Sequence, residues 1–482
     1  METPSESCAS HARPLVVDLD GTLIHSDLLL ESLVALIRQQ PGQLWRLPGW
    51  LSQGRASLKR EIAQRVQLSF DTLPLHAELF SLLQEEKAKG RFLVLATASD
   101  ATLAIPLAAQ LGLFDQIMAS DGEINLQGRA KADRLLAAFG EQGFDYAGNS
   151  AADLAVWSHA RRCIVVNGTA SIQAHVLKRD PNALVIRTPP PTLMEYLRAL
   201  RVYQWVKNSL LFVPMLFAHF FDAASFFLVL QAFIAFGFCA SSVYVLNDLL
   251  DLEEDRHHPD KRLRPMTCGR IPLLHGFLGA PLLLAIALVV AWMIQPAFFG
   301  MLLLYYALTL LYSLRIKHIV LLDVFVLATL YTVRIFAGGM LLDIPISFWL
   351  LLFSIHIFLS LAMLKRYGEL IAQRDRGRIN NTGRDYHVTD LAMLAALGGA
   401  SGYLSVLVLG LYIHSVEVTR LYRSAMFLWP ICILMLFWIS RMWLLAHRGK
   451  IQADPVLFAL KDPGSQWIGV LVALFFSVGT FW

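Results

Sequence analysis

Apolar residues are distributed very unevenly along the chain. Residues 1 to about 175 contain short apolar runs with charged residues throughout, the pattern of a water-soluble domain. From about residue 208 onward, apolar segments of roughly 18 to 24 residues recur, and about 20 apolar residues in a helix are enough to cross a bilayer. We therefore expect two domains, a soluble one at 1–175 and a membrane-embedded one at 201–482.

The second domain contains about nine such segments. They lie near 208–221, 224–246, 273–294, 297–313, 319–340, 345–364, 390–413, 425–446 and 466–482. Within the second domain, the loops after the second, fourth, sixth and eighth segments hold most of the lysines and arginines, which is typical of cytoplasmic loops. This bias predicts a multi-pass protein of the cell (inner) membrane whose soluble domain is cytoplasmic. Because the first segment is short, eight spans are the alternative.

Composition agrees with this division. Of the 482 residues, 56% are hydrophobic and 16% are charged, which is too apolar for an ordinary soluble enzyme. The net charge of +4 resides mostly in loops of the membrane half and gives no indication of nucleic acid binding. Between the domains, 176–200 carries three consecutive prolines and then apolar residues at helical spacing. We expect a stiff linker and a helix along the membrane surface, with a plain tether as the alternative.

Acidic residues gather directly after the second apolar segment, in NDLLDLEEDRHHPDKRLRP (247–265). On a helix, Asp248, Asp251 and Asp255 fall at i, i+3 and i+7 and share one face. Because like charges at this spacing repel one another, a positive group is expected among them. Mg²⁺ is commonly held by one or two carboxylates and by substrate phosphate oxygens, so these residues with Asn247 are candidate metal and substrate ligands. A solvated loop is the alternative.

Two further polar features accompany the acidic residues. The basic residues Lys261, Arg262 and Arg264 are suited to phosphate oxygens that a metal does not cover. Within the predicted spans, Asp323 and Arg334 are eleven residues apart, three helical turns, so that both can face one cavity. A structural pairing between helices is the alternative for these two residues.

The acidic segment resembles the NDxxDxxxD motif of the UbiA superfamily of membrane prenyltransferases. Its continuation, RHHPDKRLRP, is similar to the branch that contains decaprenyl-phosphate phosphoribosyltransferase. The segments LRVYQWVKNSLLFVP, YSLRIKHIVLLDV and LKRYGEL resemble further motifs of that branch. The resemblance covers about residues 195–482 and implies an all-α bundle of about nine transmembrane helices that uses Mg²⁺ to displace diphosphate.

For function, the resemblance implies transfer of 5-phosphoribose from phosphoribosyl diphosphate to a polyprenyl phosphate. Mg²⁺ at Asp248, Asp251 and Asp255 would neutralise the departing diphosphate. The ribose 5-phosphate would lie on the basic residues after the motif. The complete set of implied substrate-binding residues is Asn247, Lys261, Arg262, Arg264, Lys207, Lys317, Asp323, Lys365 and Arg366.

Two alternatives to this function stay open. Aromatic prenyltransferases of the superfamily carry a second acidic pair after the fourth span, where this chain has Asp323 alone. The single acid favours a phosphorylated co-substrate over transfer of a polyprenyl group from its diphosphate to an aromatic or quinone-precursor acceptor. A membrane half that only anchors the soluble domain is the second alternative, and it would not need acidic residues that face a cavity.

The soluble domain opens with PLVVDLDGTLIHSD, an apolar strand that ends in two acids. Asp18 and Asp20 are thus expected at the carboxyl end of a strand, where open α/β sheets carry their sites. The segment resembles the DxDGT motif of haloacid dehalogenase-like (HAD) phosphatases, and the likeness spans about 12–168. It implies an α/β Rossmannoid fold with a helical cap at 26–86. It also implies the catalytic residues Asp18, Asp20, Thr97 and Lys131, with Asp18, Asp20, Asn149 and Asp153 around Mg²⁺.

In that family the position of Asn149 is usually an aspartate. An amide oxygen can ligate Mg²⁺ but brings no full charge, so we expect a lower metal affinity. Both an active phosphatase and a degenerate regulatory or scaffold domain are compatible with the sequence. If the domain is active, removal of the 5-phosphate from a phosphoribosyl lipid would join the activities of the two halves.

Overall fold

The computed structural model describes residues 13–375, 385–415, 418, 421–451 and 454–481. The chain forms two compact units. The first comprises Met1–Leu200 and Val245–Gly279, and the second comprises Arg201–Tyr244 and Ala280–Trp482. The loop that carries the acidic motif therefore packs with the soluble domain, a grouping that the linear order of the sequence does not indicate.

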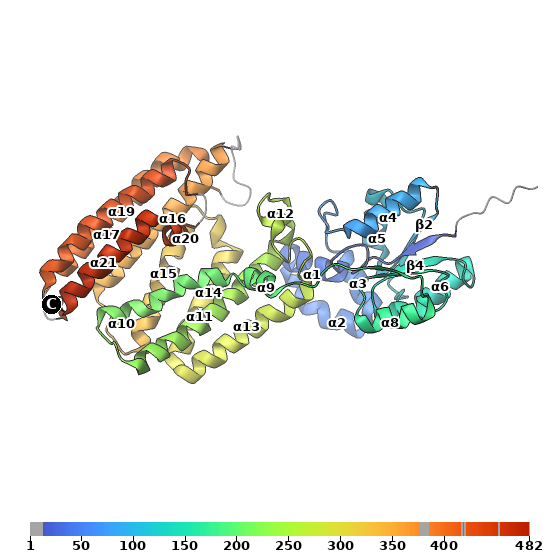
Figure 1. The fold of residues 1–482 in the computed structure, drawn as a ribbon, viewed down its shortest axis with the longest axis horizontal. Coiled ribbons are helices and arrows are strands. Elements are labelled where there is room, and N and C mark those ends of the chain that lie inside the picture. The colour runs from blue at the N-terminus through green and yellow to red at the C-terminus, as the bar shows by residue number, and fades with distance from the viewer. Residues whose placement is uncertain (1–12, 376–384, 416–417, 419–420, 452–453, 482) are drawn as a thin grey trace, which may run out of the picture. The chain divides into compact units, whose positions relative to one another are not determined.

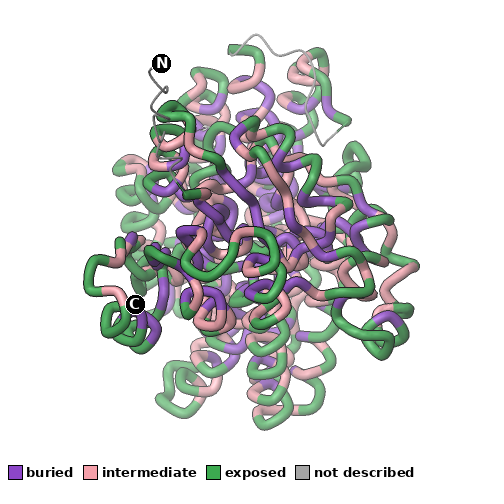
Figure 2. The backbone as a smooth tube through the Cα atoms, turned by 90° about the vertical axis from the view of Figure 1, so that its right-hand side faces the viewer, coloured by how far each residue is buried: buried purple, intermediate pink, exposed green. Residues whose placement is uncertain are grey.

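A six-stranded, all-parallel sheet forms the centre of the first unit (Figure 1). The strand order is β3-β2-β1-β4-β5-β6, and the central strand β1 pairs Val16 with Val94 on one side and with Tyr146 on the other. The inner strands read as apolar runs because both faces of the sheet are covered, and they are buried (Figure 2). The strands are β1 (Leu15–Val17), β2 (Leu93–Asp100), β3 (Gln116–Ser120), β4 (Asp145–Gly148), β5 (Cys163–Val166) and β6 (Leu184–Ile186).

Helices cover the two faces of this sheet (Figure 1). One face packs on α4 (Ala77–Ala88) and α5 (Ala101–Leu111). The other face packs on α6 (Arg129–Phe139), α7 (Leu154–Trp157) and α8 (Ala170–Arg179). The predicted α/β Rossmannoid class is confirmed.

The helical cap is present but shorter than predicted. It consists of α1 (Leu28–Gln39), η1 (Pro41–Arg46), α2 (Leu47–Ser52) and α3 (Arg55–Ala63), with a small core of its own around Leu36, Trp50 and Ile62. Helix α4, which the prediction placed in the cap, buries Leu79 and Leu83 against the sheet. Helical periodicity shows that a helix has an apolar face but does not identify the surface that covers it.

The soluble domain also extends further than residue 175. Strand β6 pairs with β5 in register Val165–Val185, although this segment was assigned to the linker. The predicted interfacial helix forms as α9 (Leu193–Ala199), whose first turn is closed by a capping box between Thr192 and Glu195. Helix α9 exposes the apolar side chain of Leu193. Its position along a membrane surface stays a prediction.

Eight helices of the described residues are long and apolar enough to cross a membrane. The assigned elements are α11 (Ala223–Leu250), α13 (Leu273–Ile294), α14 (Pro296–Leu314), α15 (Leu322–Leu341), α16 (Phe348–Asp375), α17 (Leu391–Ile413), α19 (Trp429–His447) and α21 (Pro463–Phe481). Shorter elements between them are α12 (Leu252–His257), η4 (Lys261–Leu263), η5 (Ile316–His318), η6 (Val388–Asp390), η7 (Ala425–Leu428) and α20 (Pro455–Lys461). The predicted polytopic all-α bundle is confirmed.

The first of the nine predicted spans has a different local structure. It is a 3₁₀ helix, η3 (Val202–Phe212), followed by the short helix α10 (Val213–Phe217). This segment runs antiparallel to α11, because the Trp205 ring lies 5.6 Å from that of Phe238 and the Phe212 ring lies 5.7 Å from that of Phe226. The segment therefore packs alongside α11, although neither of its two helices is long enough to span a membrane.

Glycine at position 338 allows the close approach of α15 to η3. A Cβ atom at Gly338 would lie 2.2 Å from the backbone oxygen of Leu211. We predict that Gly338→Ala destabilises the protein by about 1–3 kcal/mol, because a backbone neighbour cannot move aside. Gly300→Ala in α14 is the matched control, since nothing lies within 4 Å of the added atom. Thermal unfolding in detergent measures both, and equal midpoints would contradict the prediction.

Candidate functional sites

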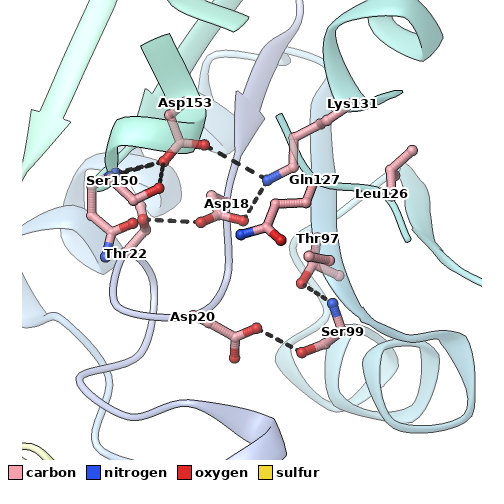
Figure 3. A network of polar contacts seen from close by, with 12 residues as sticks. Asp18, Asp20, Thr22, Thr97, Ser99, Leu126, Gln127, Lys131, Ser150 and Asp153 are labelled. Carbon is pink, nitrogen blue, oxygen red and sulfur yellow. Dashed lines mark hydrogen bonds and ion pairs between the residues drawn. The ribbon is translucent and has the colours of Figure 1, made fainter. Parts of the chain in front are cut away.

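Asp18 lies at the carboxyl end of β1, among polar side chains from several strand ends (Figure 3). Lys131 Nζ donates a hydrogen bond to Asp18 Oδ1 at 2.7 Å, and Thr22 Oγ1 lies 3.5 Å from Oδ2. Burial alone would lower the pKa of Lys131, but Asp18 and Asp153 raise it, so the ammonium group stays charged. A fixed positive charge thus adjoins the carboxylate, where it can offset the charge of an incoming phosphoryl group.

The Asp20 carboxylate points toward Ser99 (Figure 3). Ser99 Oγ donates to Oδ2 at 2.6 Å, and the backbone N–H of Leu28, the first residue of α1, donates to Oδ1 at 2.8 Å. Burial, reinforced by the nearby Asp27, raises the pKa of Asp20 to about 7. A carboxyl group with this pKa is suited to donate and accept protons at neutral pH. The geometry fits the acid/base role of Asp20, but it does not direct this side chain toward a metal shared with Asp18.

Asp153 is held by four hydrogen bonds. Its Oδ1 accepts from the Tyr146 hydroxyl at 2.6 Å, and its Oδ2 accepts from the Asn149 and Ser150 amides and the Ser150 hydroxyl at 2.8 to 3.1 Å. Burial raises the pKa of Tyr146, so its hydroxyl stays protonated and can donate. Tyr146 also accepts from Lys131 at 3.0 Å. The role of Asp153 in this geometry is to orient Tyr146 and, through it, Lys131.

Asn149 lies against the turn that follows Asp18. A Cβ at Gly21, whose φ is +73°, would lie 2.1 Å from Asn149 Nδ2, so glycine is required for this contact. A divalent cation beside Asp18 would find one carboxylate and this neutral amide, because Asp20 and Asp153 are engaged elsewhere. The donor set therefore supplies a single charged ligand, the lower end of the one or two carboxylates that usually hold Mg²⁺.

The acidic motif of the membrane half spans a break in the helix. Helix α11 ends at Leu250, and α12 begins after Asp251, which has φ −92° and ψ 12°. Backbone hydrogen bonds continue through the break, since the Asp251 N–H donates to Asn247 and the Asp255 N–H donates to Asp251, both at 2.8 Å. The predicted single helix is thus interrupted, but its hydrogen-bond spacing is kept.

The positive group expected among the aspartates is Arg264. Its Nη1 lies 3.0 Å from Asp248 Oδ1 and also pairs with Asp255 Oδ2, while Lys261 Nζ lies 3.3 Å from Asp255 Oδ1. Both carboxylates are almost completely buried, with exposed fractions of 2% for Asp248 and 0% for Asp255. Two acidic side chains seven residues apart therefore converge on one cation. Arg264 was predicted to bind phosphate, but in the structure it forms ion pairs with two of the predicted metal ligands.

This arrangement fits a magnesium ion. Among the described residues, no three His, Cys, Asp or Glu side chains lie close enough together to hold a metal on their own. Mg²⁺, however, is usually bound by one or two carboxylates together with waters and substrate phosphates. Asp248 and Asp255 supply such a pair, and Asp255 Oδ1, which accepts no hydrogen bond, has the ion pair with Lys261 at 3.3 Å.

In the second unit, Asp323 and Arg366 form a buried ion pair. Arg366 Nε donates to Asp323 Oδ2 at 2.5 Å, and the Tyr386 hydroxyl donates to Oδ1 at 2.6 Å. Arg366 also donates to Glu369 at 2.7 Å and to Tyr312 at 2.9 Å. These bonds join α15 to α16 and neutralise Asp323, so both residues, predicted as substrate ligands, are engaged with one another.

Lys207, from the QWVKN segment, pairs with Asp454 and lies 5.6 Å from the Tyr331 ring. Lys365 lies close enough to Asp454 and Lys207 to interact electrostatically with both. Two lysines therefore lie near Asp454, and Glu369 is a second carboxylate near Lys365, so the two ammonium groups form a small cluster of hydrogen-bond donors. Such a group is suited to an anionic ligand such as a phosphate.

Arg334 has different partners from Asp323. It donates to Asn208 at 3.0 Å, to the Tyr305 hydroxyl at 2.7 Å and to the Leu330 carbonyl at 2.6 Å. This network connects η3, α14 and α15, which agrees with the structural alternative for Arg334. The remaining predicted side chains are half-buried (Asn247, Asp251, Lys261 and Lys317), exposed (Arg262) or fully buried (Thr97, whose Oγ1 accepts from the Ser99 amide at 3.0 Å).

Sequence reasoning missed several residues of these sites. Tyr146 and Ser99 lie in segments that carry predicted site residues but were given no role, because the partners of a buried lysine or aspartate depend on strand order. Lys59 of cap helix α3 donates to the Ala98 carbonyl at 2.7 Å, which places an ammonium group near the end of β2. Asp454 lies about 250 residues from Lys207 along the chain, and only its N-cap position before α20 gave a local signal.

Comparisons with known proteins agree with this division into two halves. A family model described as the UbiA prenyltransferase family matches residues 210–461. Uncharacterized protein y4nM of Sinorhizobium fredii is 36% identical over 97% of this chain and 91% of its own length. Nodulation protein NoeC of Azorhizobium caulinodans is 35% identical over 58% of this chain and 90% of its own length. Decaprenyl-phosphate phosphoribosyltransferase of Mycolicibacterium smegmatis is 31% identical over 60% of this chain and 95% of its own length.

Solved structures also match each half. A UbiA homologue from Archaeoglobus fulgidus, bound to DMAPP and Mg²⁺, has a TM-score of 0.45 and 18% identity over 59% of this chain and 97% of its own. A substrate-bound phosphoserine phosphatase has a TM-score of 0.26 and 13% identity over 36% of this chain and 93% of its own.

Replacement of Asn149 tests the account of the N-terminal site. We predict that Asn149→Asp raises the Mg²⁺ affinity of this site about tenfold, because it adds a charged oxygen ligand beside Asp18. Mg²⁺-dependent thermal stabilisation of the full-length protein measures the affinity. Asn125→Asp is the control, since Asn125 contacts Lys59 and Gln127 rather than Asp18. An equal gain in both variants would indicate a non-specific charge effect.

Proposed function

The chain belongs to the UbiA prenyltransferase family, and we propose that it transfers 5-phosphoribose from phosphoribosyl diphosphate to a polyprenyl phosphate. The transferase activity is a property of the family. The proposal concerns the two substrates, and it draws on the enzyme of that name from Mycolicibacterium smegmatis. Its main structural support is the convergence of Asp248 and Asp255 on Arg264.

Mg²⁺ held by Asp248 and Asp255 would neutralise the diphosphate as it leaves. The oxygen of the lipid phosphate forms a bond to C1 of the ribose, while the bond from C1 to the diphosphate oxygen breaks and its electrons stay on the diphosphate. Arg264 and Lys261 adjoin the same carboxylates and would bind phosphate oxygens of the donor. Lys207 and Lys365, which share Asp454, are the groups best suited to hold the lipid phosphate.

The state of Asp323 supports a phosphorylated co-substrate. Enzymes of the superfamily with aromatic acceptors use further acidic residues at this place, whereas Asp323 is neutralised here by Arg366 and Tyr386. Removal of the Asp323 charge would destabilise the fold, because it would leave the buried Arg366 without one of its carboxylate partners. The pair with Arg366 therefore leaves no uncompensated acidic charge at Asp323.

Two labelled substrate pairs distinguish this function from its rivals. Membranes that contain the protein receive radiolabelled phosphoribosyl diphosphate with polyprenyl phosphate, or polyprenyl diphosphate with a labelled aromatic acid. Label should enter the lipid fraction only with the first pair. Incorporation only with the second pair would establish prenyl transfer to an aromatic acceptor, and no incorporation with either would favour a scaffold.

In the same assay, we predict that Asp248→Asn lowers the Mg²⁺-dependent rate by about 100-fold, because it removes one of two charged metal ligands. The protein should still fold, since Arg264 keeps Asp255 as a partner. The control is Asp260→Asn, an exposed acid in the same loop. Retention of wild-type turnover by Asp248→Asn would refute the assignment of the metal site.

For the N-terminal domain, we propose phosphoryl transfer from a phosphomonoester to Asp18. An Asp18 oxygen bonds to phosphorus, the ester bond breaks, and Asp20 gives its proton to the leaving alcohol. Water then attacks the phosphorus and gives a proton to Asp20, while the bond from the Asp18 oxygen to phosphorus breaks and releases inorganic phosphate. The 5-phosphoribosyl lipid is the proposed substrate, because the fused transferase would make it. The supporting geometry is Lys131 on Asp18 and the pKa of about 7 at Asp20.

We predict that Asp18→Asn lowers hydrolysis of the phosphoribosyl lipid at least about 1000-fold, as loss of a nucleophile does. Release of inorganic phosphate by the full-length protein is the measurement. Asp133→Asn, on the same helix as Lys131 but exposed, is the control. If wild-type protein and the Asp18 variant release phosphate equally slowly, the domain is a degenerate one.

A further inference from the structure

The soluble domain contacts the acidic motif through a buried ion pair. Arg256, the residue after Asp255, donates from Nη2 to Glu31 Oε1 at 2.6 Å and from Nη1 to Oε2 at 3.1 Å. Glu31 lies in the first turn of cap helix α1. Their exposed fractions are 5% for Glu31 and 8% for Arg256, so water screens neither charge. A bidentate pair in such surroundings defines both the distance and the orientation of its partners.

Neither partner of this pair is free to adopt another position. Ser26 Oγ donates to Glu31 Oε1 at 2.5 Å, and Arg256 Nε donates to the Thr267 carbonyl at 3.2 Å. At the other end of α1, Arg38 pairs with Glu254 at 2.5 Å, but both of these side chains are exposed. A salt bridge in water contributes little to stability, so the Glu31–Arg256 pair determines how α12 lies on α1.

The loop after α12 is also in contact with the base of the cap. A Cβ at Gly269, whose φ is +75°, would lie 2.6 Å from His25 Cβ and 3.1 Å from Pro74. Arg270 pairs with Glu195 of α9 at 2.8 Å. The soluble domain therefore holds both sides of the segment that contains Asp255 and Arg264.

From these contacts we infer that Glu31 and Arg256 are positioning residues for the magnesium site of the transferase. Arg256 is joined by one peptide bond to Asp255, which is fully buried and cannot be reoriented without movement of α12. The soluble domain thus contributes to metal binding without touching the metal. The inference rests on the proposed assignment of Asp248 and Asp255, but not on the identity of the substrates.

The pair also lies close to the N-terminal site. The N–H of Leu28, at the start of α1, donates to Asp20, and Glu31 lies three residues further along the same helix. A displacement of α1 therefore changes two contacts, that of Leu28 with the Asp20 carboxylate and, one helical turn further along, that of Glu31 with Arg256. By linkage, any coupling between the two sites is reciprocal in binding free energy.

Binding of Mn²⁺, followed by electron paramagnetic resonance, tests the inference in the full-length protein without substrate. The binding that is lost in Asp248→Asn identifies the transferase site. We expect Glu31→Gln to weaken this binding about tenfold, as loss of an outer partner of a metal ligand does. The exposed pair supplies the matched control, and Arg38→Gln should bind Mn²⁺ like the wild type.

A double variant separates positioning from stability. Glu31→Gln alone leaves Arg256 charged and buried, which can prevent folding, whereas Glu31→Gln with Arg256→Gln removes both charges. The double variant should regain thermal stability yet keep the weakened Mn²⁺ binding. Wild-type Mn²⁺ affinity in either folded variant would overturn the inference. Because no substrate is present, this result is independent of whether phosphoribose is the transferred group.

Discussion

Buried carboxylates need positive or hydrogen-bonding partners, because water does not stabilise their charge. The sites described above satisfy this requirement with Lys131 on Asp18, Arg264 on Asp248 and Asp255, Arg366 on Asp323, Lys207 on Asp454, and Arg256 on Glu31. The partner decides what each acid can do. Asp323 also accepts from Tyr386 and has no capacity left for chemistry, whereas Asp248 and Asp255 share one arginine that a substrate phosphate can compete for.

The loop between α11 and α13 connects the two halves of the protein. It belongs to the same compact unit as the α/β domain, although it lies between two helices of the membrane bundle. Its two sides serve different purposes. Asp248, Asp255 and Arg264 form the candidate metal site, while Arg256, Gly269 and Arg270 contact the cap, the base of the cap and α9. A fusion of two enzymes by a flexible tether would need no such buried pair.

The N-terminal site shows why motifs alone do not establish an activity. In the proposed phosphatase mechanism, Asp18 accepts the phosphoryl group with Lys131 beside it, and Asp20, held by Ser99, transfers the proton. Asn149 then lowers the charge available to a metal, and the hydrogen bonds on Asp153 assign that residue to orientation of Tyr146. The structure thus separates phosphoryl acceptance, for which the groups are present, from metal binding, for which one charge is missing.

The sequence by itself determined the α/β domain, the polytopic bundle and the proximity of Asp248 and Asp255, because local periodicity and short spacings encode these features. It also indicated a positive group among the aspartates. Only the tertiary structure decided that this group is Arg264, that Asp323 is consumed by Arg366, that α4 leaves the cap, and that Glu31 binds Arg256. Each of these is a choice among several partners of the same chemistry. The choice is made by strand order and helix packing over separations of up to 225 residues, which no local pattern records.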